Sequence, residues 1–236
     1  MTPDEKRKAD VARLRSIMGD GLDQSFWSKA WQAKATPWDK GSPQPSLINF
    51  LTKTDAGKAL VAAEGSKGSA LVPGAGTGYD VEVFASLGWS KAVGVDIAPE
   101  AVESGKRWLA EREHKPYHEE MHFKVADFFE DPKGELTGFD LAYDYTFFCA
   151  IPPSLRPKWG EAYARSVKSG GHLICLVFPI EGDRPNGPPY SVSPELITQF
   201  LEPHFELQWQ GVPPDQPEER KNIEQVMLWK RKQARG

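Results

Sequence analysis

Cysteine is scarce in this chain, because Cys149 and Cys175 are the only two among its 236 residues. Both lie in apolar, strand-like stretches, which is typical of buried reduced thiols. Two cysteines are too few to hold together a small secreted domain, so the sequence excludes a disulfide-based fold. We expect a cytoplasmic protein whose thiols stay reduced.

Long hydrophobic runs are also missing. The longest apolar stretches, such as residues 173–178, have the length of a β-strand and are far too short to span a bilayer. The first residues, 1–8, are charged and contain no apolar segment of the kind found in secretory signals. The sequence therefore predicts no membrane partner.

The chain has no excess of positive charge. Its 29 Lys and Arg residues are outnumbered by 33 Asp and Glu residues, which gives a formal net charge of −4. Proteins that bind nucleic acids usually carry a basic face that neutralises phosphates, and here basic residues cluster only near the two ends, at 6–8 and 230–232. We expect a small-molecule or small-anion partner, no nucleic acid, and a monomer.

What the sequence does contain is a regular alternation of strands and helices from residue 69 onward. Strands that alternate with helices indicate parallel βαβ units and a sheet covered on both faces. Two final strand-like segments around the Pro-rich stretch 212–217 predict an antiparallel edge. The predicted fold class is α/β, with a doubly wound, mostly parallel, seven-stranded sheet. The expected strands are 69–73, 91–96, 121–125, 139–145, 171–178, 204–211 and 223–230, and the expected helices of this part are 79–87, 99–112, 155–167 and 193–201.

The beginning of the chain has a different character. Residues 4–18 have apolar residues at helical spacing, and 43–51 predict another short helix. Three of the eight tryptophans lie between these two segments. We expect one domain over 1–236, in which residues 1–55 form a helical N-terminal lid and residues 69–232 form the core.

A glycine-rich loop follows the first expected strand. Gly74, Gly76 and Gly78 alternate there, and Asp96 ends the next strand. Such glycines let the backbone approach a ligand closely, and an acid about twenty residues further on is placed to accept hydrogen bonds from ribose hydroxyls. The sequence therefore predicts a nucleoside-bearing ligand.

The spacing of these glycines discriminates between two such ligands. A dinucleotide site requires G-x-G-x-x-G, but Tyr79 stands where the third glycine would be. The G-x-G-x-G that is present resembles the first motif of class I S-adenosylmethionine (SAM) methyltransferases. We favour SAM over NAD, and an NAD(P)-dependent reductase stays a rival hypothesis.

A second candidate contact follows the third expected strand. Asp127 and Phe128 stand where a methyltransferase loop would meet adenine, the acid accepting from the exocyclic amine and the ring covering the base. The alternative is structural: the aspartate caps a turn and the phenylalanine packs in the core. The sequence leaves both interpretations open.

Several longer strings occur in a fixed order along residues 26–231. They are Trp27-Ser-Lys-Ala-Trp31, Thr36-Pro-Trp-Asp39, Leu71-Val-Pro-Gly-Ala-Gly-Thr-Gly-Tyr-Asp80, Val93-Gly-Val-Asp-Ile97, Asp144-Tyr-Thr-Phe-Phe-Cys-Ala-Ile151, Arg156-Pro-Lys-Trp159 and Gly187-Pro-Pro-Tyr190. Together they resemble the thiopurine S-methyltransferase superfamily, and within it the thiol, thiocyanate and halide methyltransferases. The tryptophan strings and the one that begins at Asp144 are far more specific than the glycine loop.

The resemblance implies a Rossmann-like methyltransferase that uses SAM and releases S-adenosylhomocysteine. It also implies that the three tryptophans contact the cofactor and close over it, although they can equally fasten an N-terminal helix to the sheet. Two departures are Ala75, where the family often has cysteine, and the loop 181–186, which has its own sequence. The expected cofactor-binding residues are Trp27, Trp31, Trp38, Gly74, Gly76, Gly78, Asp96, Ile97, Asp127, Phe128 and Tyr145.

The chemistry of a soft nucleophile fits such a site. A thiolate, hydrosulfide, thiocyanate or halide needs no proton removed at the moment of attack, so positioning and exclusion of water can suffice. None of the five histidines shares a motif with an acid or a nucleophile, and no Cys/His spacing predicts a metal. The expected catalytic residues are Asp144 and Tyr145, and the expected acceptor-side residues are Arg156, Tyr190 and Trp38.

We therefore expect methyl transfer from SAM to a small soft nucleophile, giving a methyl thioether or a methyl halide. Two alternatives stay open. One is a thiopurine-like S-methyltransferase of xenobiotics, which would need a wider pocket. The other is a SAM-binding sensor without catalytic activity.

Overall fold

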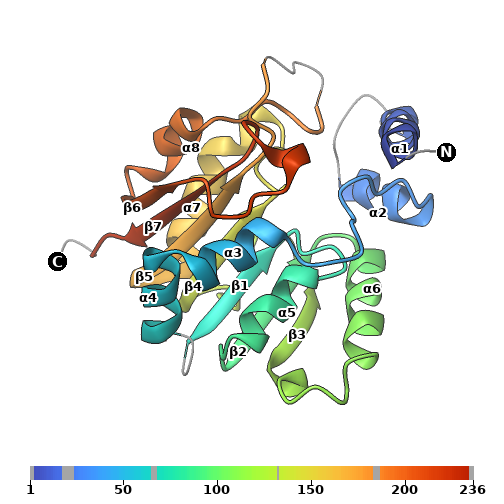
Figure 1. The fold of residues 1–236 in the computed structure, drawn as a ribbon. Helices are drawn as coiled ribbons and strands as arrows, with labels where there is room; N and C mark the ends of the chain where they lie inside the picture. Colours follow the sequence, from blue (N-terminus) through green and yellow to red (C-terminus); the bar gives the residue numbers. More distant parts are fainter. Residues whose placement is uncertain (1–2, 18–23, 65–67, 132, 183–186, 234–236) are drawn as a thin grey trace.

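The chain forms a seven-stranded sheet with helices on both faces (Figure 1). The computed structural model describes residues 3–17, 24–64, 68–131, 133–182 and 187–233. The strands lie in the order β3-β2-β1-β4-β5-β7-β6. Their bounds are β1 Ser69–Pro73, β2 Lys91–Asp96, β3 Met121–Val125, β4 Phe139–Tyr145, β5 Val167–Val177, β6 Phe205–Gly211 and β7 Gln225–Arg231.

The strand directions confirm the predicted, mostly parallel sheet. Strands β1 to β5 pair in parallel, and β7 runs antiparallel to both β5 and β6. The predicted antiparallel pairing at this edge is confirmed, with β7 inserted between β5 and the outermost strand, β6. Strand order reverses between β1 and β4, and ligands of open α/β sheets bind in the crevice outside the carboxyl ends of strands at such a point.

Strand β5 begins at Val167 and not at residue 171, where the apolar pattern begins. Phe139 pairs with Val167, and the register shifts before the next pair, Leu141 with His172. A bulge of this kind lets an irregular stretch join a ladder. The added residues read Val-Lys-Ser-Gly. The last three have little strand preference of their own, and the pairing of Val167 holds them in the strand.

The described part of the chain contains eight α-helices and three short 3₁₀-helices. Helix α5 begins directly after the glycine loop, as predicted, whereas Met18 at the end of the expected first helix lies outside the described residues. The α-helices are α1 Pro3–Ile17, α2 Gln24–Gln32, α3 Pro45–Lys53, α4 Asp55–Glu64, α5 Tyr79–Ser86, α6 Pro99–Ala110, α7 Arg156–Ser166 and α8 Pro194–Leu201. The 3₁₀-helices are η1 His118–Glu120, η2 Pro153–Leu155 and η3 Glu218–Arg220.

Helix α4 was not among the helices expected from the sequence. Its start is fixed by Thr54, whose side-chain oxygen accepts a hydrogen bond from the backbone N–H of Gly57 at 3.0 Å. A Cβ at Gly57 would lie 2.0 Å from the carbonyl oxygen of Phe50, so α4 packs on α3 through a glycine. This packing stabilises a helix whose glycine lowers its own propensity.

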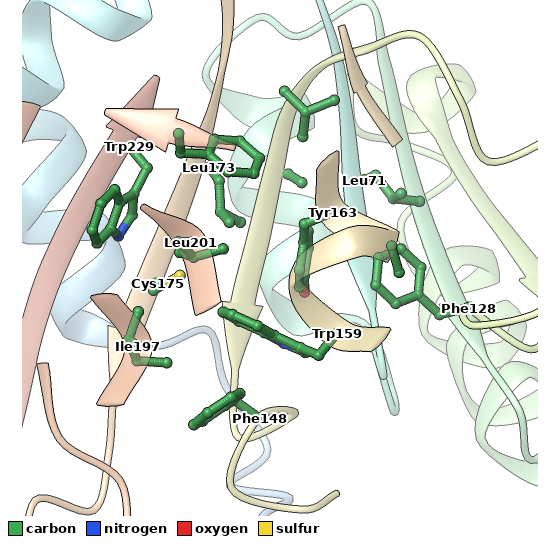
Figure 2. Close-up of a cluster of buried hydrophobic side chains, with 14 of the residues drawn as sticks. Leu71, Phe128, Phe148, Trp159, Tyr163, Leu173, Cys175, Ile197, Leu201 and Trp229 are labelled. Atoms are coloured by element: carbon green, nitrogen blue, oxygen red, sulfur yellow. The ribbon is translucent and has the colours of Figure 1, made fainter. Parts of the chain in front are cut away.

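Two apolar cores lie on opposite faces of the sheet. On one face, α3, α4 and α5 cover the strands through residues such as Phe50, Leu60 and Phe84. On the other, Figure 2 shows side chains of α7 and α8, among them Trp159 and Leu201, packed on the strands. Covering both faces leaves the carboxyl ends of the strands as the edge where a site can form.

The N-terminal helices have a small core of their own. Leu14 of α1 packs with Phe26 and Ala30 of α2 and with Ala35, separately from the two cores of the sheet. Figure 1 shows α2 beside the amino-terminal end of α6, with α1 on the far side of α2. This part of the chain therefore folds as a unit placed next to the carboxyl edge of the sheet.

Candidate active site

The glycine loop lies at the carboxyl end of β1, as predicted. Gly74, Gly76 and Gly78 have φ angles of 61°, 56° and 79°, a region that residues with a Cβ rarely adopt. A Cβ at Gly74 would lie 2.7 Å from the ring of Phe147, and one at Gly78 only 2.1 Å from the ring of Phe123. The loop therefore needs glycine for its packing as well as for its conformation.

Asp96 lies at the carboxyl end of β2 and reaches the glycine loop. Its two carboxylate oxygens accept hydrogen bonds from the backbone N–H groups of Gly76, at 3.0 Å, and Ala98, at 2.9 Å. Burial raises the pKa of this carboxyl. Each oxygen keeps a further lone pair, so the carboxylate can still accept hydroxyl donors, as expected for a ribose site. Ile97 follows it and is half-buried.

The three tryptophans of the N-terminal part form one edge-to-face cluster. The ring centroid of Trp38 lies 5.6 Å from that of Trp27 and 6.3 Å from that of Trp31, in the geometry that aromatic rings prefer. The ring of Trp31 would lie 3.4 Å from a Cβ at Gly76. The structure thus brings the tryptophans to the glycine loop, and their contact with a cofactor stays a prediction.

Asp39 fastens this cluster to the loop, a role that the sequence analysis missed. Its carboxylate accepts hydrogen bonds from the hydroxyls of Thr77 and Tyr79, both at 2.8 Å, and from the backbone N–H of Gly41 at 3.0 Å. Burial and the bond to Asp39 raise the pKa of Tyr79 to about 12, so this hydroxyl stays a donor. Because Asp39 follows Trp38 directly, these bonds hold the tryptophan at the site.

Replacement of Asp39 by alanine should weaken cofactor binding without unfolding the core. Loss of hydrogen bonds to a charged acceptor frees Trp38, and we expect the dissociation constant for SAM to rise by about tenfold, or about 1.4 kcal/mol. Isothermal titration calorimetry measures this dissociation constant. Asp55→Ala, which removes an exposed aspartate on α4, is the matched control. An unchanged SAM affinity in Asp39→Ala would refute the role of the hydrogen bonds to Asp39.

Asp127 and Phe128 lie at the carboxyl end of β3. The Asp127 carboxylate accepts a hydrogen bond from the backbone N–H of Phe129 at 2.9 Å. Phe128 is 3% exposed, and its ring centroid lies 4.8 Å from that of Tyr163 in the core. The half-buried ring at this edge is that of Phe129, which stacks on Phe147 at 5.8 Å. The turn-capping bond and the packing of the structural alternative are present, and the adenine contacts stay predictions.

Asp144 lies at the end of β4 and is only 3% exposed. Its carboxylate accepts hydrogen bonds from the Trp159 indole at 2.7 Å, the Tyr163 hydroxyl at 3.1 Å and the Phe148 backbone N–H at 3.2 Å. Burial raises its pKa to about 6. These bonds fasten α7 to β4, so Asp144 stabilises the fold, while its expected catalytic role stays a prediction.

Asp144 should make stability depend on pH. The folded protein keeps the Asp144 proton up to about pH 6, whereas an unfolded aspartate releases it near about pH 4. Protonated Asp144 therefore contributes fully to the free energy of unfolding below about pH 4. This contribution, about 3 kcal/mol, is lost as the pH rises through about 6. Asp144→Asn lacks this titration.

Urea unfolding tests this expectation. The fall in stability between about pH 4 and about pH 7.5 should be smaller in Asp144→Asn than in the parent chain by about 3 kcal/mol. Asp55→Asn should behave like the parent chain, because that carboxyl is exposed. Identical pH dependence in Asp144→Asn and the parent chain would rule out the titration of Asp144.

Tyr145 ends β4 on the other face of the sheet and has a partner that the sequence analysis missed. Arg220 in η3 donates a hydrogen bond to the Tyr145 hydroxyl oxygen at 2.9 Å. The guanidinium lies 3.9 Å from the ring centroid of Phe178 and pairs with Glu224 at 3.4 Å. Burial raises the pKa of Tyr145 to about 12, so the hydroxyl keeps its proton.

Thr146 follows Tyr145 with a φ angle of 57°. A β-branched residue in this region is an outlier, and such strain of about 1–3 kcal/mol gathers at functional sites. Its hydroxyl donates a hydrogen bond to the carbonyl of Tyr145 at 2.7 Å. The backbone therefore turns sharply where β4 reaches the crevice.

The two expected acceptor-side residues from later in the chain lie close to each other. Arg156 is 7% exposed, lies 4.8 Å from the ring centroid of Phe148 and donates to the carbonyl of Ser191 at 3.0 Å. The backbone N–H of Tyr190 donates to the carbonyl of Cys149 at 2.7 Å. Arg156 is thus buried, although it begins helix α7. Residues 183–186 of the distinctive loop lie outside the described part.

No group of three or more metal-binding side chains occurs within the described residues. In the same part of the chain, no helix combines the length and apolar character needed to cross a membrane.

The strand order, the glycine loop after β1 and the acid at the end of β2 define a Rossmann-like methyltransferase fold. One solved structure with this fold is Burkholderia thailandensis 1,6-didemethyltoxoflavin-N1-methyltransferase with bound 1,6-didemethyltoxoflavin and S-adenosylhomocysteine. It matches with a TM-score of 0.63 and 17% identity, over 92% of this chain and 94% of that chain. The fold predicted from the sequence is confirmed.

The chain belongs to the thiopurine S-methyltransferase family, whose model matches residues 22–232. It is 42% identical to the probable thiol methyltransferase 2 of Arabidopsis thaliana over 75% of this chain and 71% of that protein. It is 33% identical to the thiocyanate methyltransferase 1 of Brassica oleracea over 80% of this chain and 77% of that protein. The family resemblance inferred from the short strings is confirmed.

Proposed function

We propose that this chain is a SAM-dependent S-methyltransferase that acts on a small soft sulfur nucleophile, such as a thiolate, hydrosulfide or thiocyanate. The observation that carries the proposal is the buried Arg220 guanidinium, which donates to Tyr145 at the end of β4. Because the Tyr145 oxygen accepts from Arg220, the Tyr145 hydroxyl hydrogen is left to donate to an anionic acceptor. The names of the thiol and thiocyanate methyltransferase relatives support the same substrate class.

The residues at the carboxyl edge fit SAM as the cofactor. The glycine loop is a cradle that Cβ atoms would fill, and the Asp96 carboxylate keeps lone pairs for two ribose hydroxyls. Trp27, Trp31 and Trp38 would cover the cofactor as a lid, with an aromatic face favourable for a positive sulfonium. When bound, SAM supplies a methyl group on that sulfonium.

The residues of this chain would then bind, orient and desolvate the acceptor. A thiolate that received this methyl group would become a thioether and SAM would become S-adenosylhomocysteine, so no residue of the chain would need to remove a proton. The lid would exclude water from the anion, and alignment of the reacting atoms supplies much of the rate enhancement. No general base is required of Asp144 or of a histidine.

The acceptor would lie between β4 and the loops that cover it. Tyr145 would donate a hydrogen bond to the anion, and Arg156 and Tyr190 would line its entrance.

The experiment also tests acceptors other than sulfur anions. Iodide and other halides are soft anions that need no deprotonation, so we propose them as further acceptors. A thiopurine-like activity and a non-catalytic SAM sensor are the alternatives. The experiment is purified protein with SAM and, in separate reactions, hydrosulfide, thiocyanate, iodide, an aryl thiol and a catechol.

Turnover of the small sulfur anions, followed as S-adenosylhomocysteine by mass spectrometry and as volatile products by gas chromatography, is the expected result. Preference for the aryl thiol would favour the thiopurine-like activity. SAM binding without turnover on any acceptor would favour the sensor, and protection by NAD(P) but not by SAM in thermal unfolding would overturn the cofactor assignment.

A further inference from the structure

Glu224 is the most deeply buried carboxylate near the proposed acceptor site. It lies on the connection between η3 and β7, and its exposed fraction is 0%. Its carboxylate accepts a hydrogen bond from the Ser46 hydroxyl in the first turn of α3 and pairs with Arg220 at 3.4 Å. A buried charge is costly unless it is paired and hydrogen-bonded, and both conditions are met here.

The connection that carries Arg220 and Glu224 is fastened to α3 at further points. The Asn49 side chain donates to the carbonyl of Asp215 at 3.2 Å, and Lys53 pairs with the Asp215 carboxylate at 2.7 Å. Figure 1 shows this connection crossing from β6 past α3 to β7. Since α3 is packed on the sheet, Glu224 holds a fixed place relative to the end of β4.

The Arg220 guanidinium is held on three sides. One nitrogen donates to Tyr145 at 2.9 Å, another faces Glu224 at 3.4 Å, and its central carbon lies 3.9 Å from the centroid of the Phe178 ring. Arg220 is 9% exposed. Of these contacts, the pairing with Glu224 supplies the opposite charge that fixes the direction of the guanidinium plane.

The direction of the bond to Tyr145 determines what that hydroxyl can do. A guanidinium has donors and no acceptor, so the Tyr145 oxygen must accept from Arg220. The hydroxyl hydrogen therefore stays available for another partner. A hydroxyl that can only donate suits an anionic acceptor, which has lone pairs and no proton of its own to offer.

We infer that Glu224 is a positioning residue for the proposed methyl transfer, which orients Arg220 so that Tyr145 presents its hydroxyl hydrogen to the anionic acceptor. The inference rests on the proposed function, because it requires the acceptor to meet Tyr145. Glu224 does not touch the acceptor itself, because Arg220 and Tyr145 stand between them.

A double-mutant cycle tests the inference, since it measures whether two side chains act through each other. Glu224→Gln keeps the size and acceptor oxygen of the side chain and removes its charge. We expect kcat/KM for hydrosulfide or thiocyanate to fall by about tenfold or more, with the dissociation constant for SAM changed by less than about twofold. In a Tyr145→Phe background, the same substitution should change kcat/KM by less than about twofold.

A merely structural role gives a different result. If the losses caused by Glu224→Gln and Tyr145→Phe multiply, or if Glu224→Gln weakens SAM binding as much as it lowers kcat/KM, the inference is wrong. Glu219→Gln, which removes an exposed glutamate from the same connection, is the matched control and should behave like the parent chain. If Glu224→Gln does not fold, Ser46→Ala serves instead and should give a smaller loss that also vanishes in Tyr145→Phe.

Binding of thiocyanate to the complex with S-adenosylhomocysteine, measured by calorimetry, gives a readout without turnover. Affinity should fall in Glu224→Gln but not further in the double variant. In one outcome, the parent chain methylates sulfur anions while Glu224→Gln and Tyr145→Phe act independently of each other. That result would contradict only the role of Glu224. A parent chain that neither binds nor methylates any sulfur anion would contradict the proposed function, and the inference with it.

Discussion

Replacement of Asp96 by alanine is expected to raise the dissociation constant for SAM by roughly 30- to 150-fold, or about 2–3 kcal/mol. The Asp96 carboxylate is buried at the end of β2 and is fixed by the backbone N–H groups of Gly76 and Ala98. It is therefore preorganised to accept from ribose hydroxyls, and its loss leaves those hydroxyls without a charged acceptor. Isothermal titration calorimetry with SAM measures the effect.

Asp96 also holds the loop itself, so the variant needs a control for stability. Thermal unfolding without ligand should show a modest loss from the two missing backbone bonds, and the shift produced by SAM should shrink well beyond that loss. Asp96→Asn keeps one acceptor oxygen and should lose less affinity than the alanine variant. Unchanged SAM affinity in Asp96→Ala would remove the ribose assignment.

The sequence was sufficient to predict the glycine loop after β1 and the acid at the end of β2, because these features are local. The glycines and Asp96 belong to one strand–loop–helix–strand unit, in which spacing alone fixes the geometry. The alternation of strands and helices likewise predicted the sheet, and the tryptophan strings contributed to the family resemblance. Each of these patterns reports interactions between neighbours in the chain or in the same βαβ unit.

The contacts that sequence reasoning missed join distant segments through irregular loops. Asp39 meets Tyr79, and Arg220 meets Tyr145. One partner of each pair, Asp39 or Arg220, lies in an irregular connection whose position the sequence pattern does not fix. Arg220 stands in a stretch rich in proline and acid, where one arginine has no distinguishing pattern. Helix α4 was missed for a related reason, because Gly57 lowers its propensity and the contact with α3 restores its stability.

Replacement of Gly78 by alanine is expected to destabilise the fold by about 3 kcal/mol. Two effects combine there. Gly78 has a φ angle of 79°, and its Cβ would lie 2.1 Å from the Phe123 ring. That ring cannot move aside easily, because it also packs closely on the backbone of Gly94 and Gly105, where a Cβ would lie only 3.0 and 2.7 Å from it.

The chain offers a control that separates the two effects. Gly134 has a φ angle of 66°, but a Cβ there would meet nothing within 4 Å. Gly134→Ala should therefore cost only the conformational part, about 1 kcal/mol, and leave SAM affinity unchanged. Urea unfolding of both variants measures the difference. Equal losses would mean that the ring of Phe123 yields, and the glycine at position 78 would then be needed only for the turn that opens α5.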